Sequence, residues 1–142
     1  MTSASNKALV LAYYQHVVVE GRFEEIPNYI GELYVDHNSP NDVPTGPLAV
    51  EAHLRAIRTT FPDFTLRTHE VIAEGDWVAL RVTAEGTHLG EWLGIKPSGK
   101  HIAWRGINWD RVSGGRIVEH WGEADTVGML VQMGVNPFGS AK

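Results

Sequence analysis

The chain has 142 residues, of which 43% are hydrophobic and 20% charged, so it fits one domain (1–142) with its own core and is not expected to be disordered. Its 12 Lys and Arg residues against 17 Asp and Glu residues give a formal charge of −5, which argues against a nucleic-acid-binding surface. The absence of cysteine excludes disulfides, thiolate nucleophiles and cysteine-ligated zinc.

The first helix is predicted over residues 5–20. Apolar side chains recur at helical spacing along one stripe, which includes Val10, Tyr14 and Val17. Ser3 or Ser5 can cap its start, and Gly21 ends it.

Two further helices are predicted on either side of a polar loop. A short helix near residues 23–30 leads into residues 34–40, which are predicted to be a brief strand running into a polar loop. The polar loop contains Asn41, Asp42, Pro44 and Gly46. A third helix then starts at Pro47 with Thr45 as its cap, and Pro62 stops it. Its apolar repeat consists of Val50, Leu54, Ile57 and Phe61.

Residues 64–125 change to the alternating pattern of strands. We expect strands at 64–73, 77–87, 101–112 and 116–125. Gly114 and Gly115 between the last two strands are a hairpin signal. Residues 126–133 then predict a short helix, ended by Gly134.

Helices followed by a run of strands predict an α+β fold. The meander of four strands should form a curved antiparallel sheet wrapped around the helices, like a cone with a mouth. Pockets for small molecules favour the mouths of such barrels and half-barrels.

Two stretches identify a family. Residues 86–100 (GTHLGEWLGIKPSGK) closely resemble the "GTHxGxFxGIxPTGK" segment of SnoaL-like polyketide cyclases. Residues 116–121 (RIVEHW), followed by Asp125 and the 126–134 tail, resemble the "GRIVEHW…D…GLLQQLG" ending of that family. The segments 36–38 (DHN) and 61–63 (FPD) also match its pattern, so the resemblance covers about residues 7–134.

The resemblance implies the cone-shaped NTF2-like fold that nuclear transport factor 2 shares with ketosteroid isomerases and limonene epoxide hydrolase. It also implies a cofactor-free enzyme that acts on a small apolar or polyketide-like carbonyl compound, for example by intramolecular aldol cyclisation of a polyketide ester. The family often forms dimers or tetramers, so a homodimer or homotetramer is expected. Two alternatives stay open: a non-catalytic carrier of a small apolar molecule, and a hydroxylase or epoxide-opening enzyme.

The resemblance breaks at the family's acid–base residue. In the characterised cyclases an aspartate lies two residues after the position that matches His120, where this chain has Gly122. A histidine on the preceding strand of those cyclases corresponds to Asn108, and a glutamine to Gly106. The fold therefore carries over, whereas the catalytic residues do not carry over one by one.

His120 and Asn108 are the first candidates for catalysis. Strand alternation puts Val118, His120 and Gly122 on one face, and the resemblance turns that face inward. An inward imidazole can act as an acid or base, and burial in an apolar cone is expected to lower its pKa. Asn108 would lie beside it across the hairpin and could hold a developing oxyanion. The alternative for His120 is a structural histidine bonded to a backbone carbonyl.

The segment 36–38 and the aromatic residues offer candidates for substrate binding. Asn38 either faces the pocket mouth or forms a turn before Pro40, and either Asp36 or His37 can point inward, but not both. Trp104 and Tyr14 can stack on a flat ligand or belong to the core.

Two acidic residues near the end of the last strand are further candidates. Asp125 can take part in catalysis or cap the last helix, and the cap is favoured. Glu123 can replace the missing aspartate only if a bulge near Gly122 turns it inward.

The opposite face of the last strands looks too apolar for solvent. We expect it to contact a second subunit through Ile107, Trp109, Ile117 and Trp121.

No metal or nucleotide cofactor is expected. The histidines at 16, 53, 69, 88 and 101 are scattered, without the spacing of a helical zinc pair, and no phosphate-binding glycine loop occurs. The amino terminus lacks an apolar leader and no apolar run reaches roughly 18 residues, so we expect a cytoplasmic protein without a membrane span.

Overall fold

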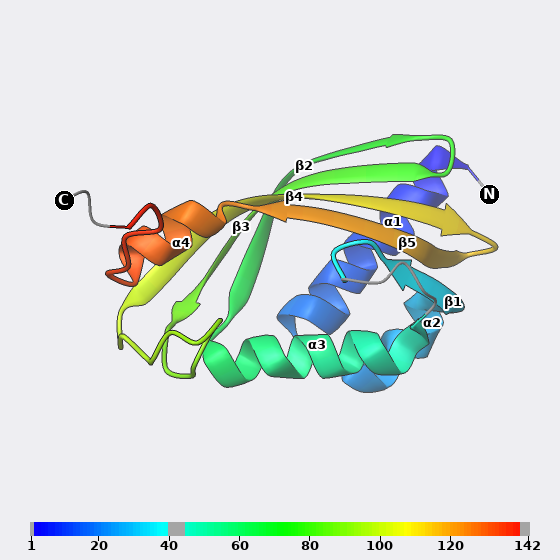
Figure 1. Cartoon of the computed structure of the whole chain (residues 1–142). Coiled ribbons are helices and arrows are strands. Elements are labelled where there is room, and N and C mark those ends of the chain that lie inside the picture. The colour runs from blue at the N-terminus through cyan, green and yellow to red at the C-terminus, as the bar shows by residue number, and fades with distance from the viewer. Residues whose placement is uncertain (1, 40–44, 140–142) are drawn as a thin grey trace.

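The structure, a computed structural model, describes residues 2–39 and 45–139 (Figure 1). Five strands form one curved sheet, and helices α1 and α3 lie along one side of it (Figure 1). The predicted α+β class is confirmed. The part of the predicted polar loop that contains Asn41, Asp42 and Pro44 lies outside the described residues.

The N-terminal helix changes its geometry along its length. It begins as α1 (Ser3–Tyr13) and continues as a π-helix, η1 (Tyr14–Val19). Its cap is Thr2 rather than Ser3 or Ser5: the Thr2 hydroxyl oxygen accepts from the Ser5 N–H, and the Ser5 hydroxyl oxygen accepts from the Thr2 N–H. Single π-turns are uncommon and occur frequently at functional sites.

The next helices are short, except α3. A 3₁₀ turn (Phe23–Glu25) is followed by α2 (Ile26–Tyr29), and α3 covers Gly46–Thr60. Thr45 precedes α3 as predicted, but its hydroxyl donates to the Tyr34 carbonyl oxygen at 3.4 Å and does not cap the helix. None of the described helices combines the length and the apolar character that a membrane crossing requires.

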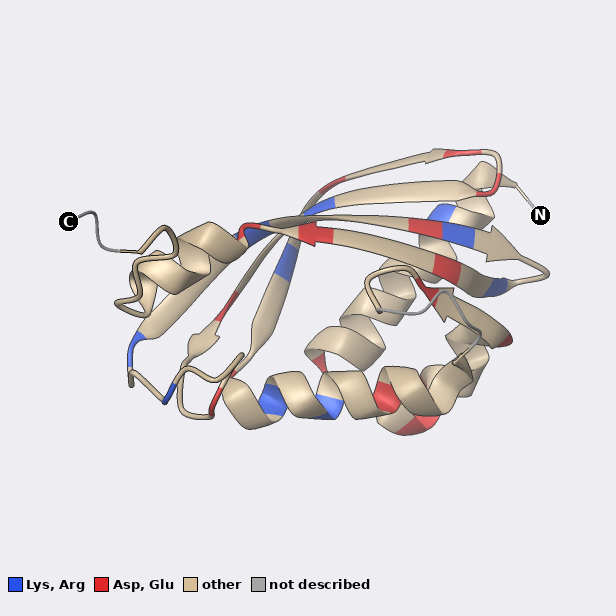
Figure 2. Ribbon diagram, in the orientation of Figure 1, with Lys and Arg blue, Asp and Glu red and all other residues tan. Residues whose placement is uncertain are grey.

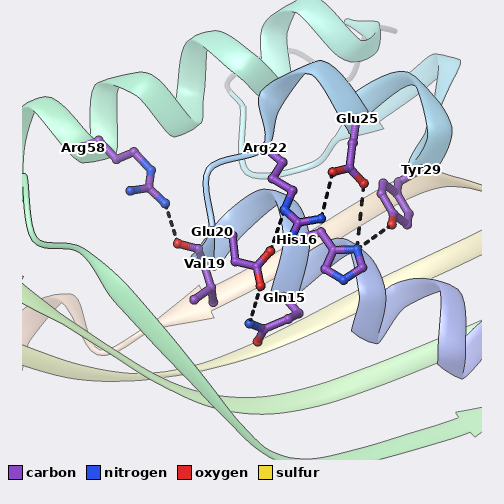
Figure 3. A network of polar contacts seen from close by, with 8 residues as sticks. All are labelled: Gln15, His16, Val19, Glu20, Arg22, Glu25, Tyr29 and Arg58. Carbon is purple, nitrogen blue, oxygen red and sulfur yellow. Dashed lines mark hydrogen bonds and ion pairs between the residues drawn. The ribbon is translucent and has the colours of Figure 1, made fainter.

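Polar contacts fasten the end of the π-helix to α3 and α2 (Figure 3). The Arg58 guanidinium on α3 donates to the carbonyl oxygens of Val18 and Val19, both at 2.8 Å. His16 Nδ1 lies 3.1 Å from the Tyr29 hydroxyl oxygen (Figure 3). Arg58 thus pairs with carbonyl oxygens that the end of a helix leaves without a partner. Together with the contact between His16 and Tyr29, it fixes the position of the π-helix that begins at Tyr14.

The sheet has the strand order β1-β5-β4-β3-β2. Its strands are β1 (Ile30–Asp36), β2 (Thr65–Glu74), β3 (Trp77–Thr87), β4 (His101–Ser113) and β5 (Arg116–Ala124). Strands β2 to β5 form the predicted antiparallel meander, and α4 (Thr126–Gln132) follows β5. The N-terminal strand β1 adds a fifth strand parallel to β5, with Asp36 opposite His120. Strands β1 and β5 are far apart in the sequence, and no turn between them indicates that they pair. The sequence pattern predicted only a brief strand near the position of β1.

A β-bulge in β5 decides which of its side chains face the helices. Consecutive residues of β4 pair with Ile117 and Glu119, which leaves Val118 as the extra residue. Ile117 is consequently buried, on the same side of the sheet as His120. The alternation predicted from the sequence, which placed Ile117 on the outer face and Val118 beside His120, is therefore wrong at these two residues.

The outer face of the sheet carries a group of exposed and half-buried apolar side chains. The Trp77 ring centroid lies 5.8 Å from that of Trp109 and 5.7 Å from that of Trp121. Ile72 and Ile107 are 70% and 55% exposed on the neighbouring strands. We call these five residues the outer-face cluster. Charged residues of both signs lie along the same strands (Figure 2).

Candidate active site

The inner face of the sheet and the helices surround a cavity of about 460 Å³, a volume typical of small-molecule pockets. Leu54, Phe64, Leu66 and Val82 are among the apolar side chains that line it. Its polar lining includes Tyr13, Tyr14, Tyr34, Asp36, Asn38, His53, Asn108, Asp110 and His120. Because these polar side chains face an otherwise apolar space, they can orient a ligand and polarise it.

Three side chains from three elements form a hydrogen-bonded chain at the cavity wall. His120 Nδ1 on β5 lies 2.6 Å from Asp110 Oδ1 on β4, and the Tyr14 hydroxyl on the π-helix donates to Asp110 Oδ2 at 3.0 Å. Asp110 is 1% exposed. A carboxylate can only accept, so the imidazole donates from Nδ1 and, when neutral, keeps its lone pair on Nε2. The sequence reading that bonded His120 to a backbone carbonyl is replaced by this pair.

The pair also sets the protonation of His120. Burial lowers the pKa of His120, but the hydrogen bond and charge of Asp110 and the charge of Asp36 outweigh it, so the pKa is raised above its ordinary value. The sequence predicted a lowered pKa because Asp110 was not recognised as a partner. Burial, with the charge of Asp110, raises the pKa of Tyr14 well above its ordinary value, so its hydroxyl stays a donor.

Gly122 lies directly next to the side chains of His120 and Asn108 in the cavity wall. A Cβ atom at Gly122 would lie 3.0 Å from His120 Nε2 and 3.1 Å from Asn108 Oδ1. Both side chains therefore lean over a position that has no side chain of its own. The Asn108 carboxamide makes no hydrogen bond with any residue in the described ranges, and it remains available to a ligand. The prediction that His120 and Asn108 lie side by side is confirmed.

Asn38 fixes the backbone of Gly122. Its Oδ1 accepts from the Gly122 N–H at 2.6 Å, and its Nδ2 donates to the Gly122 carbonyl oxygen. The turn that the sequence assigned to Asn38 belongs to Asp36, whose Oδ1 accepts from the Asn38 N–H at 2.9 Å. Asn38 lines the cavity and fixes the position of the Gly122 backbone next to His120.

Asp36 and His37 point to opposite faces. Asp36 lines the cavity, whereas His37 stacks on Trp121 on the outer face, with ring centroids 4.1 Å apart, and its Nε2 lies 3.2 Å from Glu119 Oε1. The substrate-binding role predicted for His37 is therefore withdrawn, because β1 runs parallel to β5 and presents Asp36 inward beside His120.

Trp104 and Tyr14 both line the cavity, as their substrate-binding reading requires. Trp104 packs against Phe61 and Phe64, with ring centroids 5.0 Å and 6.1 Å away. Tyr14 is buried and engaged with Asp110, so its hydroxyl serves the polar chain rather than a ligand.

Asp125 lies outside the cavity and caps α4. Its Oδ1 accepts from the Gly128 N–H at 2.9 Å, and its Oδ2 lies 3.7 Å from Arg105 Nη2. The catalytic role predicted for Asp125 is thus replaced by the cap. Glu123 contributes to the cavity lining, but it pairs with Ile107 without a register shift near Gly122, so strand alternation turns its side chain away from the face that carries His120.

We expect Asp125→Ala to destabilise the protein by about 1 kcal/mol, the usual loss for a helix cap, without changing turnover. Thermal unfolding and steady-state kinetics of the same preparation would check this. A fall in kcat at unchanged stability would return Asp125 to the reaction.

Sequence reasoning missed Asp110 and His53. Asp110 continues the alternation of Trp104, Gly106 and Asn108 along β4, which puts it on the same face of the strand. His53 was grouped with the scattered histidines, although it lies three residues after Val50 on the apolar stripe of α3. The periodicity of the strand and of the helix could therefore have identified both residues as facing the cavity. Among the described residues, no group of three or more His, Asp or Glu side chains is arranged to hold a metal ion.

The comparisons with known proteins show the family of the chain. The model of the SnoaL-like polyketide cyclase family matches residues 8–133. A nogalonic acid methyl ester cyclase from Streptomyces nogalater is 28% identical over 117 residues, which cover 80% of this chain and 87% of that protein.

Two solved structures extend the likeness. IdmH, a candidate polyketide cyclase from Streptomyces antibioticus, matches with a TM-score of 0.78 at 30% identity, covering 92% of this chain and 99% of that one. AclR, a candidate hydroxylase from Streptomyces galilaeus, matches with a TM-score of 0.80 at 28% identity, covering 99% and 87%. With a family match over most of its length and the expected fold around the cavity, the chain belongs to the SnoaL-like polyketide cyclases.

Proposed function

We propose that this protein is a cofactor-free polyketide cyclase that catalyses an intramolecular aldol addition within a polyketide ester. The observation that carries the proposal is the buried Asp110–His120 pair at the cavity wall, 2.6 Å between Oδ1 and Nδ1. The cyclase of Streptomyces nogalater, named for a methyl ester of nogalonic acid, supports the substrate class.

His120 acts as the base in this proposal. Its Nε2 takes a proton from a substrate carbon next to a carbonyl group, and the C–H electron pair moves into an enolate. The enolate carbon attacks a ketone carbon of the same molecule, which forms the new C–C bond and leaves an alkoxide. The alkoxide takes up one proton and the His120 imidazolium releases one, so the product is an isomer of the substrate. No oxidant and no second substrate are consumed.

The environment of His120 suits this task. A general base works best when its pKa lies near the working pH, and Asp110 raises the pKa of His120 from a value that burial alone would lower. The Asn108 carboxamide, next to the imidazole, donates to the enolate oxygen and stabilises its charge. In this proposal His120, which Asp110 on the neighbouring strand activates, takes over the acid–base role of the aspartate that this chain lacks at Gly122.

The direct test is cyclisation of nogalonic acid methyl ester by the purified protein, followed by chromatography and mass spectrometry. We expect a product of unchanged mass and a different retention time, at equal rates with and without a chelator and in the absence of oxygen. A product heavier by one oxygen atom would identify a hydroxylase instead. Tight binding of the ester without turnover would identify a carrier.

We also propose that the outer-face cluster is the contact of a homodimer. Trp109 is 46% exposed and lies beside Trp77, in a patch that also holds Ile72 and Ile107. Exposed apolar patches of this kind mark interaction sites. Ile117, which the sequence had assigned to this contact, is buried and plays no part in it.

Trp109→Glu is expected to convert the dimer into a monomer, because it buries a charge against the partner's apolar face. Light scattering at micromolar concentration measures this, with Leu33→Glu, exposed on the edge strand β1, as the control. A wild-type protein that is already monomeric would contradict the proposal.

A further inference from the structure

His53 is a polar residue in the apolar wall that α3 contributes to the cavity. Ala49, Val50, Leu54 and Ile57 line the cavity from the same face of the helix. Its imidazole makes no hydrogen bond with any residue in the ranges 2–39 and 45–139. His53 is exposed and lines the cavity, so its ring nitrogens, which have no protein partner in those ranges, are accessible to a molecule bound in the cavity.

The position of His53 complements that of His120. His53 faces the cavity from the helical side, while His120 and Asn108 face it from the strands β5 and β4. A flat molecule in the cavity would therefore meet donors from both sides.

The two histidines also differ in their protonation. Partial shielding from water inside the cavity lowers the pKa of His53; the carboxylate of Asp36 opposes this, and the positive charge of His120 lowers the pKa further. The pKa of His120 is raised instead. Paired titratable groups whose environments separate their pKa values in this way are typical of acid–base sites with two distinct roles.

We propose that His53 is a second catalytic residue, whose neutral imidazole donates an N–H to the oxygen of the ketone that the enolate attacks. This inference rests on the proposed cyclase function and gives the second oxygen of the reaction its own donor. The ketone oxygen becomes an alkoxide when the C–C bond forms, so a donor aimed at it gains strength in the transition state. No proton needs to leave His53, because the hydrogen bond alone stabilises the charge.

The first test is kinetic. His53→Leu keeps a side chain of similar bulk and removes the donor, and we expect kcat for the ester to fall about 10²–10³-fold with little change in KM. His53→Gln, which restores an N–H donor, should recover part of the loss. The acid limb of the pH–rate profile, which His120 sets, should stay in place in both variants. His101→Leu, outside the cavity, serves as the control.

The second test separates this inference from the proposed function. The carbon-bound proton of the His53 ring, observed by NMR in the inactive His120→Gln variant, should shift when the 1,3-diketone benzoylacetone is added. If the wild type cyclises the ester and His53→Leu does so equally well, His53 has no catalytic role and the function stands. If the wild type cyclises nothing, the function fails, and the NMR titration decides the role of His53 alone. A His53 signal that does not move then overturns the inference.

Discussion

Replacing His120 by glutamine is expected to lower kcat by about 10²–10⁴-fold, the range that one general base contributes, while the protein stays folded. Glutamine can still donate to Asp110 Oδ1 but has no basic nitrogen to face the space above Gly122. Initial rates, with far-ultraviolet circular dichroism as the check on folding, measure this. A variant that keeps the wild-type rate would remove His120 from the mechanism.

The same pair makes a signed prediction about pH. His120 must be neutral to act as a base, so the rate should rise with pH through its pKa, which Asp110 raises. Asp110→Asn removes the negative charge, and the acid limb of the pH–rate profile should move to lower pH. The rate at the alkaline plateau should fall, because a histidine with a lower pKa is a weaker base. Asp76→Asn, in the turn between β2 and β3, is the matched control.

Gly122→Ala is expected to lower kcat by about 10-fold, although it adds a single methyl group. The new Cβ would lie 3.0 Å from His120 Nε2 and 3.1 Å from Asn108 Oδ1, closer than side chains normally pack, so both must move away. Shifts of a few tenths of an ångström relieve these contacts, and since a misplacement of about 1 Å can cost about 10²-fold, a smaller loss is expected here. Asn38 holds the Gly122 backbone at both its N–H and its carbonyl, so the strand cannot yield instead.

A double-variant comparison makes the reason testable. If the alanine acts by displacing His120, adding Gly122→Ala to His120→Gln should cause little further loss, because interacting sites are not additive. Independent, multiplying losses would indicate that the methyl group blocks the substrate itself. A single variant as active as the wild type would contradict the displacement of the base.

The sequence predicted those parts of the fold whose signals are local. The period of Val50, Leu54 and Ile57 gave α3, and two glycines gave the hairpin of β4 and β5. The parallel pairing of β1 with β5 was not predictable in this way, since it depends on contacts between distant segments. The bulge at Val118 was not predicted either, because no residue type in this segment indicates that one residue of β5 lacks a partner on β4.

The same distinction between local signals and contacts of distant segments applies to the candidate site. Alternation and the family resemblance together placed His120 and Asn108 side by side. The direction of the His120 pKa came out wrong because it depends on Asp110, a partner on another strand. His37 was misplaced because the orientation of β1 relative to β5 was unknown, and that orientation decides which of two adjacent residues turns inward.

The bulge at Val118 has a consequence for how this protein tolerates insertions and deletions. Side chains in a strand alternate, so adding one residue between the bulge and Gly122 would turn His120 to the outer face. A length change at Gly114, in the hairpin loop, lies on the far side of the bulge, where an irregular pairing already exists to absorb it. Deleting Val118 itself would leave Ile117 and Glu119 opposite consecutive residues of β4, in regular alternation, with His120 still turned inward. Libraries that vary loop length in this protein should therefore keep function at the hairpin and lose it in the four residues before Glu123.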